Sequence, residues 1–312
     1  MDTRSLIKFG RTSYAVTLPQ SWIKKEGLGK GDPIHFEDNG SGLFISSSSK
    51  TKKDQNKKIE IDVTDKDLFR IRRELVAYYI NGYDVIRIIG KDLMNKSKDI
   101  RDIMHSLVSL EVLEQTATRM TAKVFLSSKN IFIPQLIRKL DILNRNMMED
   151  MTAKSVDYND ILQRDNDVDR LTFLLLRIIK TNLQDNSSAR IANLSNNKLL
   201  DYWNVAYALE AIADEVRKLS FVFKDLSKNK AAFKNIIGLY SYLVKAYLKA
   251  MDAYYAHDVE SAYKTSSIKI EVIQRCAELY NRYWDKKGAV IALERIKDLA
   301  FLIHGMGRRV YS

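Results

Sequence analysis

Polar and apolar positions alternate along the first part of the chain. Between Tyr14 and Leu18 every second residue is large and apolar, which is the period of a half-buried strand, and Pro19 ends it. The run SWIKKEGL then predicts a short helix closed by Gly27. Two more alternating strands, PIHFE and GLFIS, flank the turn at residues 38–40. The pattern therefore predicts a small β domain over residues 1–48, with two β-hairpins around a short helix.

The next two segments differ in composition. Residues 49–58 are mostly lysine, serine and other polar types, which predicts a basic linker. Residues 59–130 read as a small α/β unit. Its predicted elements, in order, are the strand IEIDV, the helix DKDLFRIRRELVAYYI, the strand DVIRII, the helix SKDIRDIMHSLV and a strand pair around residues 117–119.

From Phe132 onward the apolar residues recur with the period of long helices. Six helices are expected, at residues 133–154, 158–183, 197–224, 231–257, 259–284 and 288–306. ALEAIADEV at residues 208–216 returns as ALERIKDLA at residues 292–300, which suggests two related three-helix halves, about 131–226 and 229–312. The predicted fold class is mainly α with a small β head.

Composition narrows the kinds of partner. The chain of 312 residues carries a formal charge of +12, which favours nucleic acid or an anionic membrane surface. No apolar stretch approaches the roughly 20 residues needed to cross a bilayer, and the first eight residues lack the apolar core of a signal peptide. A cytoplasmic location is expected. The single cysteine, Cys276, is expected to be a small core side chain.

Two groups of residues are candidates for function. Carboxylates four residues apart share a helix face and could bind one hard cation, although such pairs also occur on solvated faces. They are Asp165 with Asp169, Glu210 with Asp214, and Glu294 with Asp298. Basic side chains around the first strand and the short helix could bind DNA phosphates, or could be ordinary surface charges. They are Arg4, Lys8, Arg11, Lys24 and Lys25.

No sequence pattern favours an enzyme. A carboxylate-bridged di-iron enzyme needs Glu-x-x-His pairs, and the four histidines do not provide them. The chain also contains no Gly-rich phosphate loop, no nucleophile elbow and no HExxH motif.

The run LIKFGRTSYAVTLPQSWIKKEGLGKGDPIHF, residues 6–36, resembles the AbrB/SpoVT/MazE swapped-hairpin DNA-binding domain. The features shared with that family are the Gly-Arg turn, the strand into Leu-Pro, the basic helix and the Lys-Gly-Asp that follows. The resemblance implies a homodimer or larger assembly in which two chains interleave their hairpins. It also implies that Arg11, Lys24 and Lys25 contact DNA, with Arg4 and Lys8 as further candidates.

The C-terminal part resembles the PhoU family of phosphate-uptake regulators. RDNDVDRLTFLLLR at residues 164–177 is similar to the Asp-rich helix of that family, and the repeated ALE motifs are similar to its second signature. The combination is similar to archaeal PhoU-like regulators. The resemblance implies a metal site, with iron, zinc, manganese or magnesium as candidates, at Asp165, Asp169, Glu210 and Asp214. Glu294 and Asp298 would belong to the second half, whose middle helix offers only Glu271.

The sequence therefore leads to one main hypothesis and two alternatives. The main hypothesis is a transcriptional regulator of phosphate uptake that binds DNA through its head and senses a signal through its helices. The first alternative is an adaptor that restrains a phosphate transporter or its signalling partner, with the head as a dimerisation device. The second is a metal-dependent hydrolase.

Overall fold

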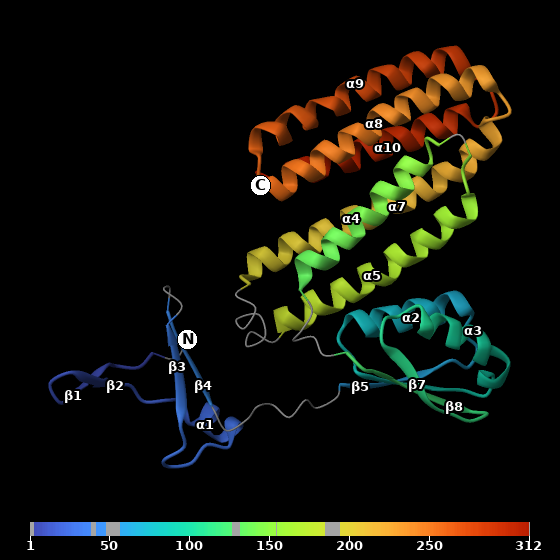
Figure 1. Ribbon diagram of the computed structural model, residues 1–312. Helices are drawn as coiled ribbons and strands as arrows, with labels where there is room; N and C mark the ends of the chain where they lie inside the picture. Colours follow the sequence, from blue (N-terminus) through green and yellow to red (C-terminus); the bar gives the residue numbers. More distant parts are fainter. Residues whose placement is uncertain are drawn as a thin grey trace. The chain divides into compact units, whose positions relative to one another are not determined.

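The computed structural model describes residues 3–38, 42–47, 57–126, 132–153, 155–184 and 194–311. Figure 1 shows their helices and strands. Their contacts divide the chain into two units, Met1–Asn56 and Lys57–Ser312. The helices predicted from the apolar period are all present in the second unit. The chain is mainly helical with a small β region at its N-terminus, which confirms the coarse fold prediction.

The first unit, called the head below, is built from short elements. They are β1 (Ile7–Phe9), β2 (Ser13–Ala15), α1 (Gln20–Glu26), β3 (Ile34–Asp38) and β4 (Leu43–Ser47). β1 pairs with β2 and β3 pairs with β4, both antiparallel. Gly27 ends α1 in the left-handed conformation, with φ of 66°, and its N–H donates to carbonyls of the last turn. The two hairpins around a short helix are therefore as predicted.

Two boundaries in this region differ from the prediction. The strand expected to reach Leu18 ends at Ala15, because Ala15 pairs with Ile7, the first residue of β1, and no described strand pairs with the residues that follow. Lys58 begins β5, and the Lys57 ammonium donates to the Asn81 carbonyl at 3.1 Å, so these two residues belong to the second unit. The rest of the expected linker, residues 49–56, lies outside the described residues, as do Asn39 and Gly40 of the expected turn.

The α/β part of the second unit is a four-stranded sheet with two helices. Its elements are β5 (Lys58–Asp62), α2 (Leu68–Ile80), β6 (Val85–Ile89), α3 (Leu93–His105), β7 (Leu110–Gln115) and β8 (Arg119–Val124). The strand order is β5-β6-β8-β7, in which β5 and β6 are parallel and β8 is antiparallel to both its neighbours. α2 and α3 cover one face of the sheet, on the side toward the long helices (Figure 1). Apolar residues of alternate strand positions and of these helices form one core.

Six long helices complete the second unit. They are α4 (Ile133–Asp150), α5 (Tyr158–Gln184), α7 (Asn196–Leu226), α8 (Lys230–Ala256), α9 (Val259–Tyr283) and α10 (Ala289–Arg308). α4, α5 and α7 pack against one another, and so do α8, α9 and α10. Four of these helix starts carry side-chain caps, in which a side chain accepts from backbone N–H groups of the first turn. The capping residues are Asp157, Ser195, Asn229 and Asp258. None of the helices in the described part of the chain combines the length and apolar character needed to cross a membrane.

Polar contacts join the two groups of helices. Glu215 of α7 is buried and accepts two hydrogen bonds from Arg295 of α10, at 3.1 and 3.3 Å. Between α4 and α8, the fully buried Asp141 accepts from the Tyr247 hydroxyl at 2.8 Å and pairs with Arg145. Because α7 and α10 also pack along their lengths, the repeated ALE motifs lie on two helices in direct contact.

Arg177 joins the helices to the α/β part. It lies on α5, is 5% exposed, and donates to the carbonyls of Tyr79 and Tyr83 at 2.6 and 2.9 Å and to the Asp84 carboxylate at 2.7 Å. Asp84 in turn accepts from the backbone N–H of Lys57 at 3.0 Å. One buried guanidinium therefore connects α5, the end of α2 and the residue at which the second unit begins.

Candidate functional site

The basic residues proposed for DNA contact all lie on the surface of the head. Arg4 precedes β1, Lys8 lies on β1, and Arg11 lies in the turn between β1 and β2. Lys24 and Lys25 occupy the last turn of α1. All five side chains are exposed. One hairpin and one short helix therefore present the positive charge, as required for contacts to a phosphate backbone.

The apolar residues of the head are exposed as well. The exposed fraction is 73% for Phe9, 62% for Tyr14 and 59% for Phe36, and no side chain described within residues 3–47 is buried. Alternating strands of this kind normally pack one face against a core. A segment of this size cannot stabilise itself when its apolar side chains stay in water. The apolar face of the head therefore lacks a cover within its own unit.

The first acidic pairs meet between two packed helices. Asp165 and Asp169 lie on α5, and Glu210 and Asp214 lie on α7. Burial raises the pKa of Asp165 to about 6, and the charges of Asp169 and Asp214 add to this while Arg217 opposes it. Burial, followed by the charges of Asp169, Asp214 and Asp165, raises the pKa of Glu210 to about 7. The structure thus brings these four carboxyl groups, called the acidic face below, close enough to influence one another.

Basic side chains contact two members of the acidic face closely. Arg217 contacts both Asp165, at 2.7 Å, and Asp214, and Lys218 lies 2.8 Å from Asp214. Burial acts to raise the pKa of Asp214, but hydrogen bonds from Lys218 and Arg217 outweigh it and hold that pKa below its usual value. Mutual repulsion among four carboxylates should raise the pKa of each of them. Asp214 departs from this because its two cations lie within one turn of α7.

The other two members have weaker compensation. Arg72 of α2 lies 3.6 Å from Asp169, whose pKa is raised by burial and by Asp214. In the described part of the chain no hydrogen bond or ion pair reaches the Glu210 carboxylate. Basic side chains therefore contact Asp165 and Asp214 directly and Asp169 at a longer distance, whereas Glu210 has only the charge of Lys218 in its vicinity.

The four carboxylates are suitable metal ligands by their chemistry but not by their placement. Four carboxylates supply the oxygen ligands that hard cations prefer. Within the described ranges, however, no three His, Cys, Asp or Glu residues are placed so as to hold a metal ion. Arg217 and Lys218 already contact oxygens of Asp165 and Asp214 that a metal would need. As arranged here, the acidic face fits internal ion pairs, and a metal would have to replace them.

The second-half carboxylates do not form a comparable face. Glu294 and Asp298 on α10 each have a side chain 55% exposed, and they pair with Lys297 at 2.6 Å and with Arg295 at 3.7 Å, respectively. Glu271 is not their partner, since it contacts Tyr242 and Arg275. The expected pair is therefore a solvated, ion-paired helix surface.

Sequence reasoning missed the basic residues that control these sites. Arg217 and Lys218 follow Asp214 by three and four residues, a spacing that places them on the same helix face. Arg177 stands inside the apolar run LLLRII, and a charged residue there signals a buried partner. The burial of Cys276 was expected, and burial raises the pKa of its thiol to about 12.

We compared the chain with protein-family models, with curated proteins and with solved structures, and none of them matches it. The family resemblances therefore rest on the residues quoted for them in the sequence.

Proposed function

We propose that this protein is a homodimeric, DNA-binding transcriptional regulator of phosphate uptake, and not an enzyme. The observation that carries the proposal is the state of the head, in which an exposed apolar face and exposed basic residues occur together. A second copy of the chain would cover the apolar face, and the basic residues would stay exposed for contact with DNA. The phosphate-related role and a PhoU-like pairing of two three-helix bundles are proposed from the sequence resemblance.

The acidic face is proposed as the ion-responsive part of the helical domain, with iron, zinc, manganese or magnesium as candidate metals. Two features support it. No hydrogen bond or ion pair reaches the Glu210 carboxylate in the described structure, and burial of Asp165, Asp169 and Glu210 raises their pKa values. Asp169 also contacts Arg72 of α2, so a change in charge at the acidic face would change an ion pair with the α/β part.

Selection of bound fragments from genomic DNA, followed by binding measurements on Arg11→Ala, tests the DNA-binding proposal. An arginine on a structured hairpin can hold a bidentate contact, and losing it should weaken operator binding at least tenfold, an effect of about 1–3 kcal/mol. Arg87→Ala is the matched control, because Arg87 is an exposed arginine on β6. It should change operator affinity less than twofold.

The salt dependence separates this proposal from the adaptor alternative. A regulator should retain a preference for its selected site at moderate salt, whereas sequence-independent binding should vanish there. Sedimentation of the full chain should show a dimer. Loss of all binding at moderate salt, or equal binding by Arg11→Ala and the wild type, would refute DNA recognition by the head.

A further inference from the structure

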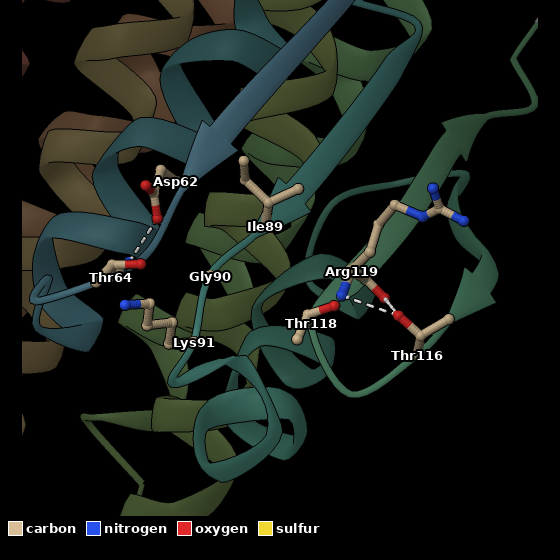
Figure 2. Close-up of a pocket in the computed structure, with 8 residues that line it drawn as sticks. All are labelled: Asp62, Thr64, Ile89, Gly90, Lys91, Thr116, Thr118 and Arg119. Carbon is tan, nitrogen blue, oxygen red and sulfur yellow. Dashed lines mark hydrogen bonds between the residues drawn. The ribbon is translucent and has the colours of Figure 1, made fainter.

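The α/β part contains a pocket that neither the head nor the acidic face uses. It has a volume of about 630 Å³ and is lined by residues at the carboxyl ends of β5 and β6 and by the turn between β7 and β8 (Figure 2). The lining residues are Asp62, Thr64, Ile89, Gly90, Lys91, Thr116, Thr118 and Arg119. Ligands of open α/β sheets bind beyond the carboxyl ends of parallel strands. The volume also falls within the range of small-molecule sites, roughly 300–1,000 Å³.

Strand register and one glycine fix the floor of the pocket. Asp62, Ile89 and Arg119 are aligned across β5, β6 and β8. Gly90 follows β6 with φ of 154°, and a Cβ at this position would lie 3.0 Å from the Val63 side chain and 3.1 Å from the Thr64 backbone nitrogen. The backbone at Gly90 therefore passes close to the residues that follow β5, and a larger side chain at this position would push the two segments apart.

Most polar side chains of the pocket already have a hydrogen-bond or ion-pair partner. The Asp62 carboxylate accepts from the Thr64 N–H at 2.8 Å, and hydrogen bonds from Thr64 hold the pKa of Asp62 below its usual value. The Arg119 guanidinium pairs with Glu114 at 2.6 Å and in Figure 2 points away from Lys91. The Thr116 hydroxyl bonds within its own turn, accepting from the Arg119 N–H at 3.0 Å.

Two donors remain. Neither the Lys91 ammonium nor the Thr118 hydroxyl has a hydrogen bond or ion pair within the described residues, and both line the pocket. Lys91 comes from the segment after β6 and Thr118 from the β7–β8 turn, so they approach the pocket from two different elements (Figure 2). A free cation and a free hydroxyl in one pocket favour a ligand with anionic oxygens.

We propose that this pocket binds a small molecule through a phosphate or carboxylate group, which Lys91 and Thr118 hold while the rest of the molecule lies against Ile89 and the Gly90 backbone. The inference goes beyond the proposed function and does not depend on it, because the pocket and the head belong to different units. Binding is measured without DNA, so failure of either proposal leaves the other standing.

The test is calorimetric titration of the full chain with inorganic phosphate, AMP and citrate, and with adenosine as the uncharged comparison. At least one of the three anions should bind with a Kd below 1 mM, and adenosine should bind at least tenfold more weakly. Stronger binding of phosphate and AMP than of citrate would identify the phosphate form of the ligand, and the reverse order would identify the carboxylate form.

Matched variants locate the binding. Lys91→Gln should weaken the anion at least fivefold and Thr118→Val at least twofold. Lys98→Gln removes the same charge from an exposed position of α3 outside the pocket, and it should leave the Kd within twofold of wild type. Lys91 is exposed, so its variant should keep the wild-type melting temperature. Absence of binding by all three anions, or equal losses in Lys91→Gln and Lys98→Gln, would overturn the proposal.

Discussion

Replacing Arg177 by methionine should destabilise the second unit strongly. The change keeps most of the aliphatic stem but removes a guanidinium that is 5% exposed. The Tyr83 carbonyl then loses its donor, whereas the Tyr79 carbonyl keeps the Gly82 N–H at 3.1 Å. Within the described residues, the Asp84 carboxylate keeps the Lys57 N–H. Removing one partner of a buried ion pair costs roughly 3–5 kcal/mol. Because the Asp84 side chain is 35% exposed and can be rehydrated, the lower end applies, about 3 kcal/mol.

Thermal and urea unfolding of the full chain measure this effect. For a unit of this size each kcal/mol corresponds to about 2–4 °C, so Tm should fall by roughly 6–12 °C. Arg72→Met is the matched control, because Arg72 also joins the α/β part to α5 but is 48% exposed and lies 3.6 Å from its partner. It should cost less than about 1 kcal/mol. Similar losses in the two variants would show that burial of Arg177 is not what holds these parts together.

Two further predictions concern the acidic face. Burial raises the pKa of Glu210 from its ordinary value of 4.5 to about 7 in the folded state. Between these two pH values the folded protein holds a proton that the unfolded chain releases. The folded state is therefore destabilised, relative to low pH, as pH rises through about 7. In metal-free protein, Glu210→Gln should therefore raise Tm at pH 8 and give no gain at pH 4.5, whereas the exposed control Glu294→Gln should show no such pH dependence; a gain that is equal at both pH values would contradict the assigned titration. Mn²⁺ should raise the wild-type Tm in proportion to the logarithm of its concentration, and Asp169→Asn with Asp214→Asn should abolish this shift while Glu294→Gln with Asp298→Asn preserves it. Thermal-shift series with metal analysis of the purified proteins are the measurement, and equal shifts in both double variants would show the acidic face to be an ion-paired surface only.

The order and type of the helices and strands followed from local patterns in the sequence. The 3.6-residue period predicted each long helix, and short apolar or alternating runs predicted the strands of the mixed sheet. In the head, alternation predicted a strand through Leu18, but the paired segment ends at Ala15 because its neighbour begins at Ile7. Pairing partners are set by tertiary structure, so a strand's length cannot be read from its own residues.

The candidate site shows the same division. The four-residue spacing of carboxylates on two helices predicted the faces, and packing of α5 against α7 joined them. The spacing could not show which cations would reach them, since Arg72 lies 97 positions before Asp169 in the chain. The acceptors of Arg177 could not be predicted from the sequence either, because they lie more than 90 residues away from it in the chain. The pocket beyond β5 and β6 depends on strand order, which no local pattern encodes.

The contact between α7 and α10 has a consequence for how the helices unfold. α7 carries Glu210 and Asp214, and the next residue, Glu215, accepts hydrogen bonds from Arg295 of the other group of helices. Opening of one group alone would expose the buried side of α7 and leave Glu215 without Arg295. The six helices should therefore open as a single cooperative unit, and the slowest-exchanging amide hydrogens should occur in both α7 and α10 with the same free energy of opening. The second group of helices, which has no acidic face of its own, would in this way share any stabilisation that the first receives.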